Sequence, residues 1–282
     1  MFKRQSLLLL ISSFVILGTI LLQMGLYVTS IFAGCNMKFN VIGICHSWLR
    51  SLGLTFLEYV LDGLVVYTLL CVLWKVGSQF IQTVKVKKHI QLYKEKQLTT
   101  EMNQRYGEGK ENILVLSYPA PMAITMGFLS PKIILTTGLI SLLTSDELKA
   151  VIYHEEYHKK NRDPLKVFLL SLSSSILWYI PIQNWFLKTY RVIQEVLADK
   201  FAIKQQDTTV NLGSALLKML KTGEQPKIPI TYVSFADTSV NYRIKYMLNP
   251  VSKVSLGFPL KVVSISVVVF SVICGLFIYV LA

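Results

Sequence analysis

Four long apolar segments, separated by polar and basic stretches, dominate the sequence. They cover residues 7–32, about 54–80, 165–187 and 259–282. A helix needs about 20 apolar residues to cross a bilayer, so the first, second and fourth segments are each long enough to span one. Hydrophobic residues make up 52% of the chain and charged residues only 16%, which is unusual for a soluble domain. The sequence therefore predicts a multi-pass membrane protein.

The basic residues predict the orientation of these segments. Lys3 and Arg4 precede the first segment, and five lysines lie within residues 85–96, after the second. Because basic residues are enriched on the cytoplasmic side of membranes, both stretches are expected inside the cell. Three true spans then place the C-terminus outside. We attribute the net charge of +13 to contact with anionic lipid headgroups rather than nucleic acid, since the sequence carries no base-reading motif.

The apolar segments also divide the chain into three predicted parts. Residues 1–82 form an N-terminal membrane region with two transmembrane helices, residues 83–258 form a domain that faces the cytoplasm, and residues 259–282 form a C-terminal transmembrane helix. Residues 111–143 are rich in β-branched and aromatic residues and are broken by prolines and a glycine. This pattern predicts two or three short strands joined by turns.

A helix is predicted directly after these strands. Thr144 is its expected N-cap, Glu147 completes a capping box, and Pro164 marks its expected end. The helix carries the sequence HEEYH, in which His154 and His158 are four residues apart and share one helix face, so that both can bind one zinc ion. A solvated helix face rich in His, Glu and Lys gives the same string, so the motif alone does not decide between a zinc site and surface charge.

A catalytic zinc site requires three protein ligands and one open position. The segment RVIQEVLADKFA supplies Glu195, which can complete a set with the two histidines, and Asp199, which can orient one of them. In an H-E-x-x-H motif the glutamate, here Glu155, takes a proton from the water that zinc acidifies. The second segment alone could be an ordinary amphipathic helix with two acids, but both segments together favour zinc.

These motifs resemble the membrane zinc metallopeptidases of the BlaR/MecR type over roughly residues 85–250. The similar segments are MGFLSPKIILTTGLISLLTSDELKAVIYHEEYHKKNRDPLK and LWYIPIQNWFLKTYRVIQEVLADKFA. The family's usual WFNP is not kept, and A-D replaces the commoner A-C-D, a variant that is similar to HtpX-like and prenyl-protein (CAAX) proteases. The resemblance implies a membrane α-helical protein with a small α+β gluzincin-like zinc metallopeptidase module, made of an H-E-x-x-H helix, a short β-sheet and an E-x-x-x-D helix.

The resemblance also implies an integral membrane zinc endopeptidase of a bacterial cell membrane, with Zn²⁺ as its cofactor. Its substrate would be a polypeptide, either a repressor or a membrane protein. Only two spans are expected before the module and no penicillin-binding sensor domain, so a signal would have to come from a sensor partner, a second copy or the membrane.

In such proteases the substrate lies extended beside an edge strand near the active-site helix. The candidate strand comprises Met122, Ala123, Ile124, Thr125, Met126, Gly127 and Phe128, with plain sheet core as the alternative. Arg243 matches a basic residue of the relatives, and could either stabilise an oxyanion or pair with an acid.

The membrane topology gives a physical constraint on the third apolar segment. His154, His158 and Glu195 must meet on one side of the membrane, so residues 165–187 cross it an even number of times. Two crossings need about 40 residues. The segment is therefore predicted to be re-entrant or buried against other helices, with a break at Pro181.

Two alternative functions remain open at this stage. One is a quality-control protease like the HtpX group, and the other is a zinc-stabilised membrane scaffold without turnover, against which the intact Glu155 argues.

The roles of two further pairs of residues also remain open. Cys35 and Cys45 could form a disulfide or stay free, and Glu58 and Asp62 could be functional or lie at the membrane interface, with the helix starting near Tyr59.

Overall fold

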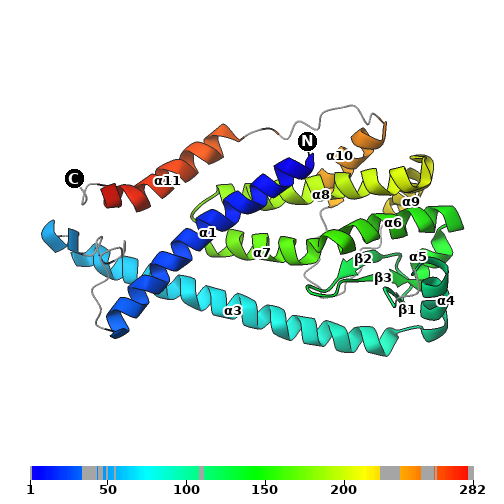
Figure 1. Cartoon of the computed structure of the whole chain (residues 1–282), viewed down its shortest axis with the longest axis horizontal. Helices are drawn as coiled ribbons and strands as arrows, with labels where there is room; N and C mark the ends of the chain where they lie inside the picture. The colour runs from blue at the N-terminus through cyan, green and yellow to red at the C-terminus, as the bar shows by residue number, and fades with distance from the viewer. Residues whose placement is uncertain are drawn as a thin grey trace. The chain divides into compact units, whose positions relative to one another are not determined.

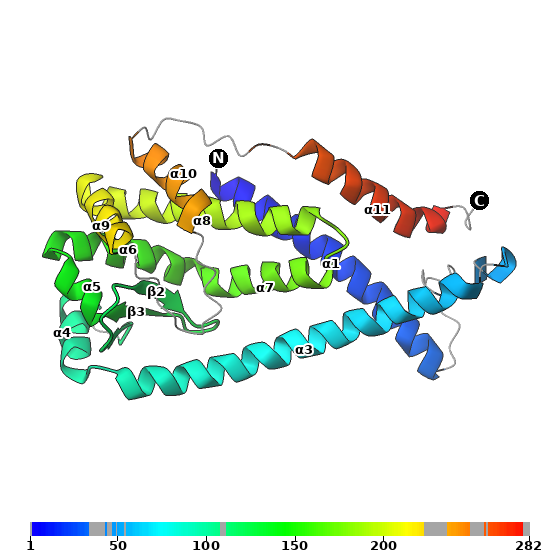
Figure 2. The same cartoon turned by 180° about the vertical axis from the view of Figure 1, so that it is seen from behind.

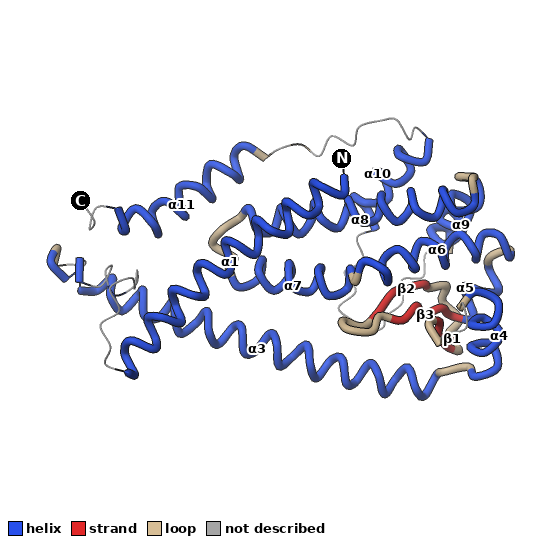
Figure 3. The backbone as a smooth tube through the Cα atoms, viewed as in Figure 1, coloured by secondary structure: helices blue, strands red, loops and turns tan. Residues whose placement is uncertain are grey.

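A computed structural model of the protein describes residues 2–33, 43, 47–48, 50–53, 55–107, 111–222, 236–248, 257 and 259–278 (Figure 1). The chain forms two compact units, here called the mixed unit and the helical unit. The mixed unit comprises Met1–Ser6, Gln79–Phe168 and Thr189–Leu256, and the helical unit comprises Leu7–Ser78, Leu169–Lys188 and Gly257–Ala282. The predicted mostly helical fold with a small sheet is confirmed, as Figure 3 shows.

The helical unit contains most of α1 (Phe2–Ala33), the first part of α3 (Thr55–Tyr93) and α11 (Leu260–Ile278). Two stretches, Phe2–Thr29 and Asp62–Tyr93, are long and apolar enough to cross a membrane by length and composition. α11 lies within the segment 259–282 predicted as a span, and the apolar stretch among its described residues is Leu260–Ser271.

The helical unit also contains the end of α7 (Asp163–Ile176) and the start of α8 (Ile182–Gln206), which lie side by side in both views (Figures 1 and 2). Pro181 lies in the turn between them, where a break was predicted. Ile176, Leu177, Ile180 and Ile182 around this turn are buried with Ile20, Met24 and Tyr27 of α1 and Val65 of α3.

Four polar side chains are buried within this apolar packing and bind one another or the backbone. Ser13 Oγ of α1 lies 2.6 Å from Gln183 Oε1 and 3.2 Å from Ser173 Oγ, and Ser266 Oγ of α11 accepts a 2.9 Å hydrogen bond from the backbone N–H of Ile182. A polar group buried without a partner would cost free energy, so these bonds favour one arrangement of the helices that carry them.

The mixed unit is built on a three-stranded sheet with the order β1-β3-β2. β3 (Lys132–Thr136) is the central strand; β1 (Ile113–Leu116) is parallel to it and β2 (Ala123–Met126) is antiparallel. One face of the sheet packs on α6 (Ser145–Asn161), α4 (Lys96–Tyr106), α5 (Thr137–Leu142) and α9 (Val210–Lys221) through a common core. The last helix of the mixed unit is α10 (Ala236–Leu248).

The predicted start of α6 is confirmed. The Thr144 side chain accepts a hydrogen bond from the Glu147 backbone N–H, and the Glu147 carboxylate accepts one from the Thr144 backbone N–H, which completes the capping box. The helix ends at Asn161, and Arg162 takes the left-handed conformation. Pro164 then lies in the first turn of α7, a position where its missing N–H costs nothing.

The prediction of two or three short strands within residues 111–143 is confirmed by β1, β2 and β3, but the end of this stretch differs. Residues 137–142 lie within the stretch predicted as strands but form α5, because the Thr136 side chain caps this helix by accepting a hydrogen bond from the Leu139 backbone N–H. Gly138 permits the close approach there, since a Cβ atom would lie 1.8 Å from the Pro119 carbonyl oxygen.

α3 begins at Thr55, close to the predicted start of the second apolar segment at about residue 54 and before Tyr59, where one of the two alternatives for Glu58 and Asp62 placed it. Asp62 is therefore inside α3, where its Oδ1 accepts a 2.5 Å hydrogen bond from the Tyr27 hydroxyl. Glu58 belongs to the same helix, but its side chain is outside the described residues, as are Cys35 and Cys45.

Candidate metal centre

Helix α6 carries the two histidines of the HEEYH motif. His154 and His158 are four residues apart, one turn of the helix, and their Nε2 atoms lie 3.2 Å from each other. Both imidazoles are largely shielded from solvent, with side-chain exposures of 7% for His154 and 12% for His158. A solvated helix face would leave these rings exposed, so their burial argues against the surface-charge interpretation.

Helix α8 supplies the third donor. Glu195 Oε2 lies 3.4 Å from His154 Nε2, and Glu195 Oε1 lies 3.5 Å from His158 Nε2. The three residues offer ligand atoms that all lie within 4.8 Å of one another. A tetrahedral zinc ion with nitrogen and oxygen ligands at about 2.0–2.1 Å separates any two of them by about 3.3–3.4 Å. The spacing and the chemistry of the donor set therefore both fit zinc.

A separate carboxylate lies behind each histidine. Asp199 Oδ1, from α8, is 2.8 Å from His154 Nδ1, a contact with the distance of an ion pair but not the angle of a regular hydrogen bond. Asp163 Oδ2, at the start of α7, is 2.8 Å from His158 Nδ1 and forms a hydrogen bond with it. Acids that bind Nδ1 orient the imidazole ring and leave Nε2 directed at the point where the three ligand atoms converge.

Asp163 was not among the residues singled out in the sequence. It lies five residues after His158 and just beyond the end of α6, where helical periodicity no longer predicts which side chains share a face. The left-handed Arg162 turns the chain so that Asp163 faces back toward His158. The Asp-Pro pair was the available signal, since it marks a helix start close to the motif.

Arg243 of α10 pairs with two of these acids. Its Nε and one terminal nitrogen each lie 2.9 Å from a carboxylate oxygen of Asp199, and its other terminal nitrogen lies 3.3 Å from Glu195 Oε2. Asp199 is completely buried, so this bidentate pair compensates a charge that would otherwise be costly. Of the two roles considered for Arg243, the structure places it as the partner of acids.

The electrostatics of the cluster favour a positive charge at its centre. Burial and the Arg243 cation lower the pKa of His154, but Asp199 and Glu195 outweigh them and raise it to about 9. Burial likewise lowers the pKa of His158, yet Asp163 and Glu195 raise it above its ordinary value. Burial raises the pKa of Glu195, but the two histidines and Arg243 hold it well below its usual range. The raised pKa values mean that the two imidazoles favour binding a proton. A divalent cation can supply the same positive charge as such protons.

Glu155, directly after His154, contacts the sheet rather than the ligand cluster. It is buried, and its Oε2 lies 2.8 Å from the hydroxyl oxygen of Thr125 on β2. β2 is the outer strand of the sheet, and among the described residues no further strand pairs with its free edge. The candidate substrate strand thus coincides with β2 at Ala123–Met126, while Met122, Gly127 and Phe128 flank it.

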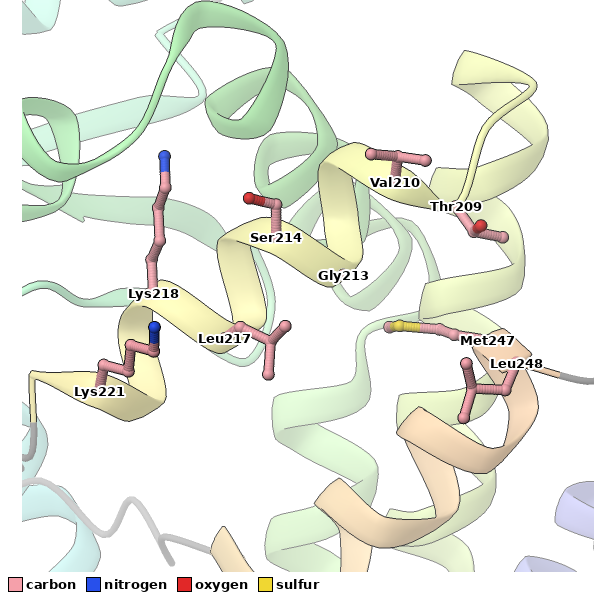
Figure 4. Close-up of a pocket in the computed structure, with 9 residues that line it drawn as sticks. All are labelled: Thr209, Val210, Gly213, Ser214, Leu217, Lys218, Lys221, Met247 and Leu248. Carbon is pink, nitrogen blue, oxygen red and sulfur yellow. The ribbon is translucent and has the colours of Figure 1, made fainter.

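A separate pocket of about 520 Å³ lies between α9 and α10 (Figure 4). None of the predicted site residues lines it. Its walls are mostly apolar, with Lys218 and Lys221 at one end. The lining residues are Thr209, Val210, Gly213, Ser214, Leu217, Lys218, Lys221, Met247 and Leu248.

A helix with H-E-x-x-H, joined by a glutamate from a second helix, is the ligand arrangement of a class of zinc-dependent peptidases. The chain belongs to the BlaR1 peptidase M56 family, whose model matches residues 54–247. This match includes all the ligand candidates, Glu155 and Arg243. Membership of a peptidase family indicates a protease.

Individual relatives point to two kinds of protein. The Regulatory protein BlaR1 of Bacillus licheniformis is 30% identical over 139 residues, which cover 48% of this chain and 23% of that protein. A Protease HtpX homolog of Moorella thermoacetica is 35% identical over 79 residues, 27% of this chain and 26% of the relative. A Protease HtpX homolog of Caldanaerobacter subterraneus subsp. tengcongensis is 33% identical over 86 residues, 29% and 28% of the two chains. The aligned part is thus about a quarter of each relative's length.

Proposed function

We propose that this protein is an integral membrane zinc endopeptidase with His154, His158 and Glu195 as the zinc ligands. The observation that carries the proposal is the convergence of their donor atoms, 3.2–3.5 Å apart. The acid behind each histidine supports it, because a ring oriented through Nδ1 keeps Nε2 available as a ligand. Surface charge alone would require neither feature.

In the proposed reaction, Glu155 is the general base. Zinc supplies Lewis acidity, which acidifies water and polarises the substrate carbonyl. The Glu155 carboxylate accepts the proton of the attacking water and passes it to the nitrogen of the leaving amine. Burial keeps this carboxylate away from bulk solvent. Asp199 and Asp163 hold the two histidines, and Arg243 holds Asp199 and Glu195 in place.

The proposed substrate is a polypeptide that pairs with the free edge of β2. Main-chain hydrogen bonds from an edge strand hold a peptide in an extended conformation regardless of its sequence. The similarity to a regulatory protein supports a role in signalling, with a repressor or membrane protein as substrate and a sensor partner or second copy delivering the signal.

The proposed location is the cell membrane, with the N-terminus and the site in the cytoplasm and the C-terminus outside. The apolar helices and the basic stretch after the second segment support this location.

The first test is the metal content of the detergent-purified protein, measured by mass spectrometry. We expect about one zinc per chain, the stoichiometry of one three-ligand site. Glu195→Gln should lose most of it, and Glu155→Gln should keep it, because Glu155 is not a ligand. Wild type that lacks zinc after careful preparation, or Glu195→Gln with full zinc, would contradict the proposed site.

A quality-control protease is the second candidate, favoured by the similarity to two Protease HtpX homologs. Trapping with Glu155→Gln separates the two roles, since a signalling protease should retain one or few proteins and a quality-control protease many misfolded membrane proteins. A non-catalytic scaffold is the third candidate. It requires the metal ligands but not the base, so a Glu155→Gln variant with full biological activity and no cleavage would favour it.

A further inference from the structure

Thr125 on β2 contacts the proposed general base directly. Its hydroxyl oxygen lies 2.8 Å from Glu155 Oε2 and 2.9 Å from the backbone carbonyl oxygen of Glu155. A threonine hydroxyl has a single proton, so it can donate to only one of these acceptors at a time. Both acceptors belong to Glu155, so the contact joins β2 to α6 at the residue that follows the first histidine.

The pleat of β2 explains why Thr125 can reach α6. Met122 and Ile124 are buried in a cluster with Ile134 on one face of the sheet, whereas Ala123 packs on the opposite side against the core that includes residues of α6. Successive side chains of a strand alternate between faces, so Thr125 shares the face of Ala123. The half-buried Thr125 side chain at this position faces the buried carboxylate of Glu155.

A buried carboxylate has a strong requirement for hydrogen-bond donors. Glu155 is only 8% exposed, and the Thr125 hydroxyl is the donor that reaches its Oε2. A hydrogen bond to Oε2 restricts the rotation of the carboxylate, and in the proposed reaction Oε1 is then the oxygen that accepts the proton of a water molecule. General bases act only within hydrogen-bond reach of the proton they remove, so this orientation bears directly on the rate.

We propose that Thr125 is a positioning residue that orients Glu155 for proton transfer; the proposal rests on the proposed function above. Because β2 is also the proposed substrate strand, one residue then links the seating of the peptide to the orientation of the base. Thr125 acts through Glu155, and the proposal gives it no bond to the substrate or metal.

The kinetic test compares full-length Thr125→Val and Thr125→Ser with wild type, using a peptide selected from a quenched-fluorescence library. Valine keeps the shape but lacks the hydroxyl, so we expect kcat to fall about 10- to 100-fold with KM nearly unchanged. Serine restores the hydroxyl and should return kcat to within about threefold of wild type. The control is Ile133→Val, which perturbs packing at the cross-strand partner of Thr125 without removing a hydroxyl and should keep the wild-type kcat.

A second measurement separates positioning from simple packing and does not depend on activity. The melting temperatures of wild type, Thr125→Val, Glu155→Ala and the double variant form a thermodynamic cycle, because alanine removes the acceptor and valine the donor, with zinc content recorded for each. We expect unchanged zinc content in every variant. The melting temperature of the double variant should fall by less than the sum of the decreases in the two single variants. Strictly additive losses, or equal kcat in Thr125→Val and wild type, would overturn the proposal. If wild type cleaves no peptide, the proposed function fails, while the cycle still decides whether the two side chains interact.

Discussion

Asp163 and Asp199 reach the two ligand histidines by different routes. Asp199 lies one turn after Glu195 on α8, so helical spacing alone predicted that it would lie near the ligands. Asp163 depends on the turn at Arg162 and accepts a further, long hydrogen bond of 3.4 Å from the Tyr190 hydroxyl. Asp199 is bound by the Arg243 guanidinium instead. Each histidine is therefore held by an acid that is itself held by another side chain.

We predict that Asp163→Asn weakens zinc binding by about 10- to 100-fold, the effect that loss of such an orienting acid typically has. The amide keeps the size of the side chain but removes the negative charge that holds His158 through Nδ1. The measurement is competition with a chelator of known zinc affinity. The control for the lost charge is Asp146→Asn. Asp146 is an exposed acid in the first turn of α6, the helix that carries His158. Equal affinities in both variants would show that Asp163 is not needed to orient His158.

At the scale of single elements, the N-terminus of α6 has a second function besides capping. The Glu147 carboxylate accepts hydrogen bonds from the Thr144 backbone N–H, the Ser214 hydroxyl and the Lys218 ammonium group. The last two residues belong to α9, so one buried acid joins α9 to the helix that carries the ligand histidines. A capping box visible in the sequence thus also fixes a contact between distant segments.

This contact predicts a pH-dependent stability. Burial raises the pKa of Glu147, but Lys218, Ser214 and the Thr144 N–H outweigh it and lower the pKa to about 2 from an ordinary value of 4.5. A carboxyl group whose pKa is lower in the folded state stabilises the fold at pH values above its unfolded-state pKa. This stabilisation is lost as the pH falls from about 4.5 toward 2. Lys218 is 37% exposed, so solvent screening limits the contribution to about 1–2 kcal/mol.

The measurement compares the melting temperatures of metal-free wild type and Glu147→Gln between neutral and acidic pH. Wild type should be the more stable protein at neutral pH, and the difference should shrink below about pH 4.5. Glu156→Gln is a suitable control, because Glu156 pairs with the exposed Lys160 on the same helix and should show only a small, salt-sensitive effect. A difference between wild type and Glu147→Gln that is constant with pH would rule out the ionised carboxylate as its origin.

The elements that the sequence predicted well are those with strong local signals. α6 has a capping box and a terminating Asp-Pro, and the apolar periodicity of α8 places Glu195 and Asp199 on one face. α5 was missed because TTGLISLL has the composition of a strand, and its helix depends on the Thr136 cap and on packing of Gly138 against a distant carbonyl. The Thr125–Glu155 and Arg243–Asp199 contacts join residues 30 and 44 positions apart, which no local pattern reports.

At the scale of the whole molecule, the division at residues 82 and 83 does not coincide with a break in the backbone. α3 continues without interruption from the apolar segment through Lys85, Lys87 and Lys88 to Tyr93. Between Gln79 and Tyr93 the sequence contains neither proline nor glycine, and lysine is a good helix former. Directly after α3, Lys94 forms an isolated antiparallel bridge with Leu116 of β1, so the helix leads without a linker into the sheet region of the mixed unit.

The buried polar contacts of the helical unit predict where the α7–α8 turn lies. If α1 crosses the bilayer, Ser13 is well inside its apolar stretch, and the partners of Ser13 on α7 and α8 must lie at a similar depth. The hairpin is too short to cross twice, so it should enter the bilayer and return, covered by α1 and α11. Ser13, Ser173 and Gln183 then satisfy one another in a region without water.

Cysteine labelling tests this arrangement in inside-out vesicles. Trp178 lies in the turn and is 63% exposed within the protein, so only lipid would shield a cysteine at this position. In a background without the four native cysteines, Trp178→Cys should react far more slowly with a membrane-impermeant maleimide than Ser141→Cys, an exposed position on α5. The thiolate that reacts is strongly disfavoured in hydrocarbon. Equal labelling rates would place the turn in water, and the two ligand-bearing helices would then be joined by an aqueous hairpin rather than by one held in the membrane.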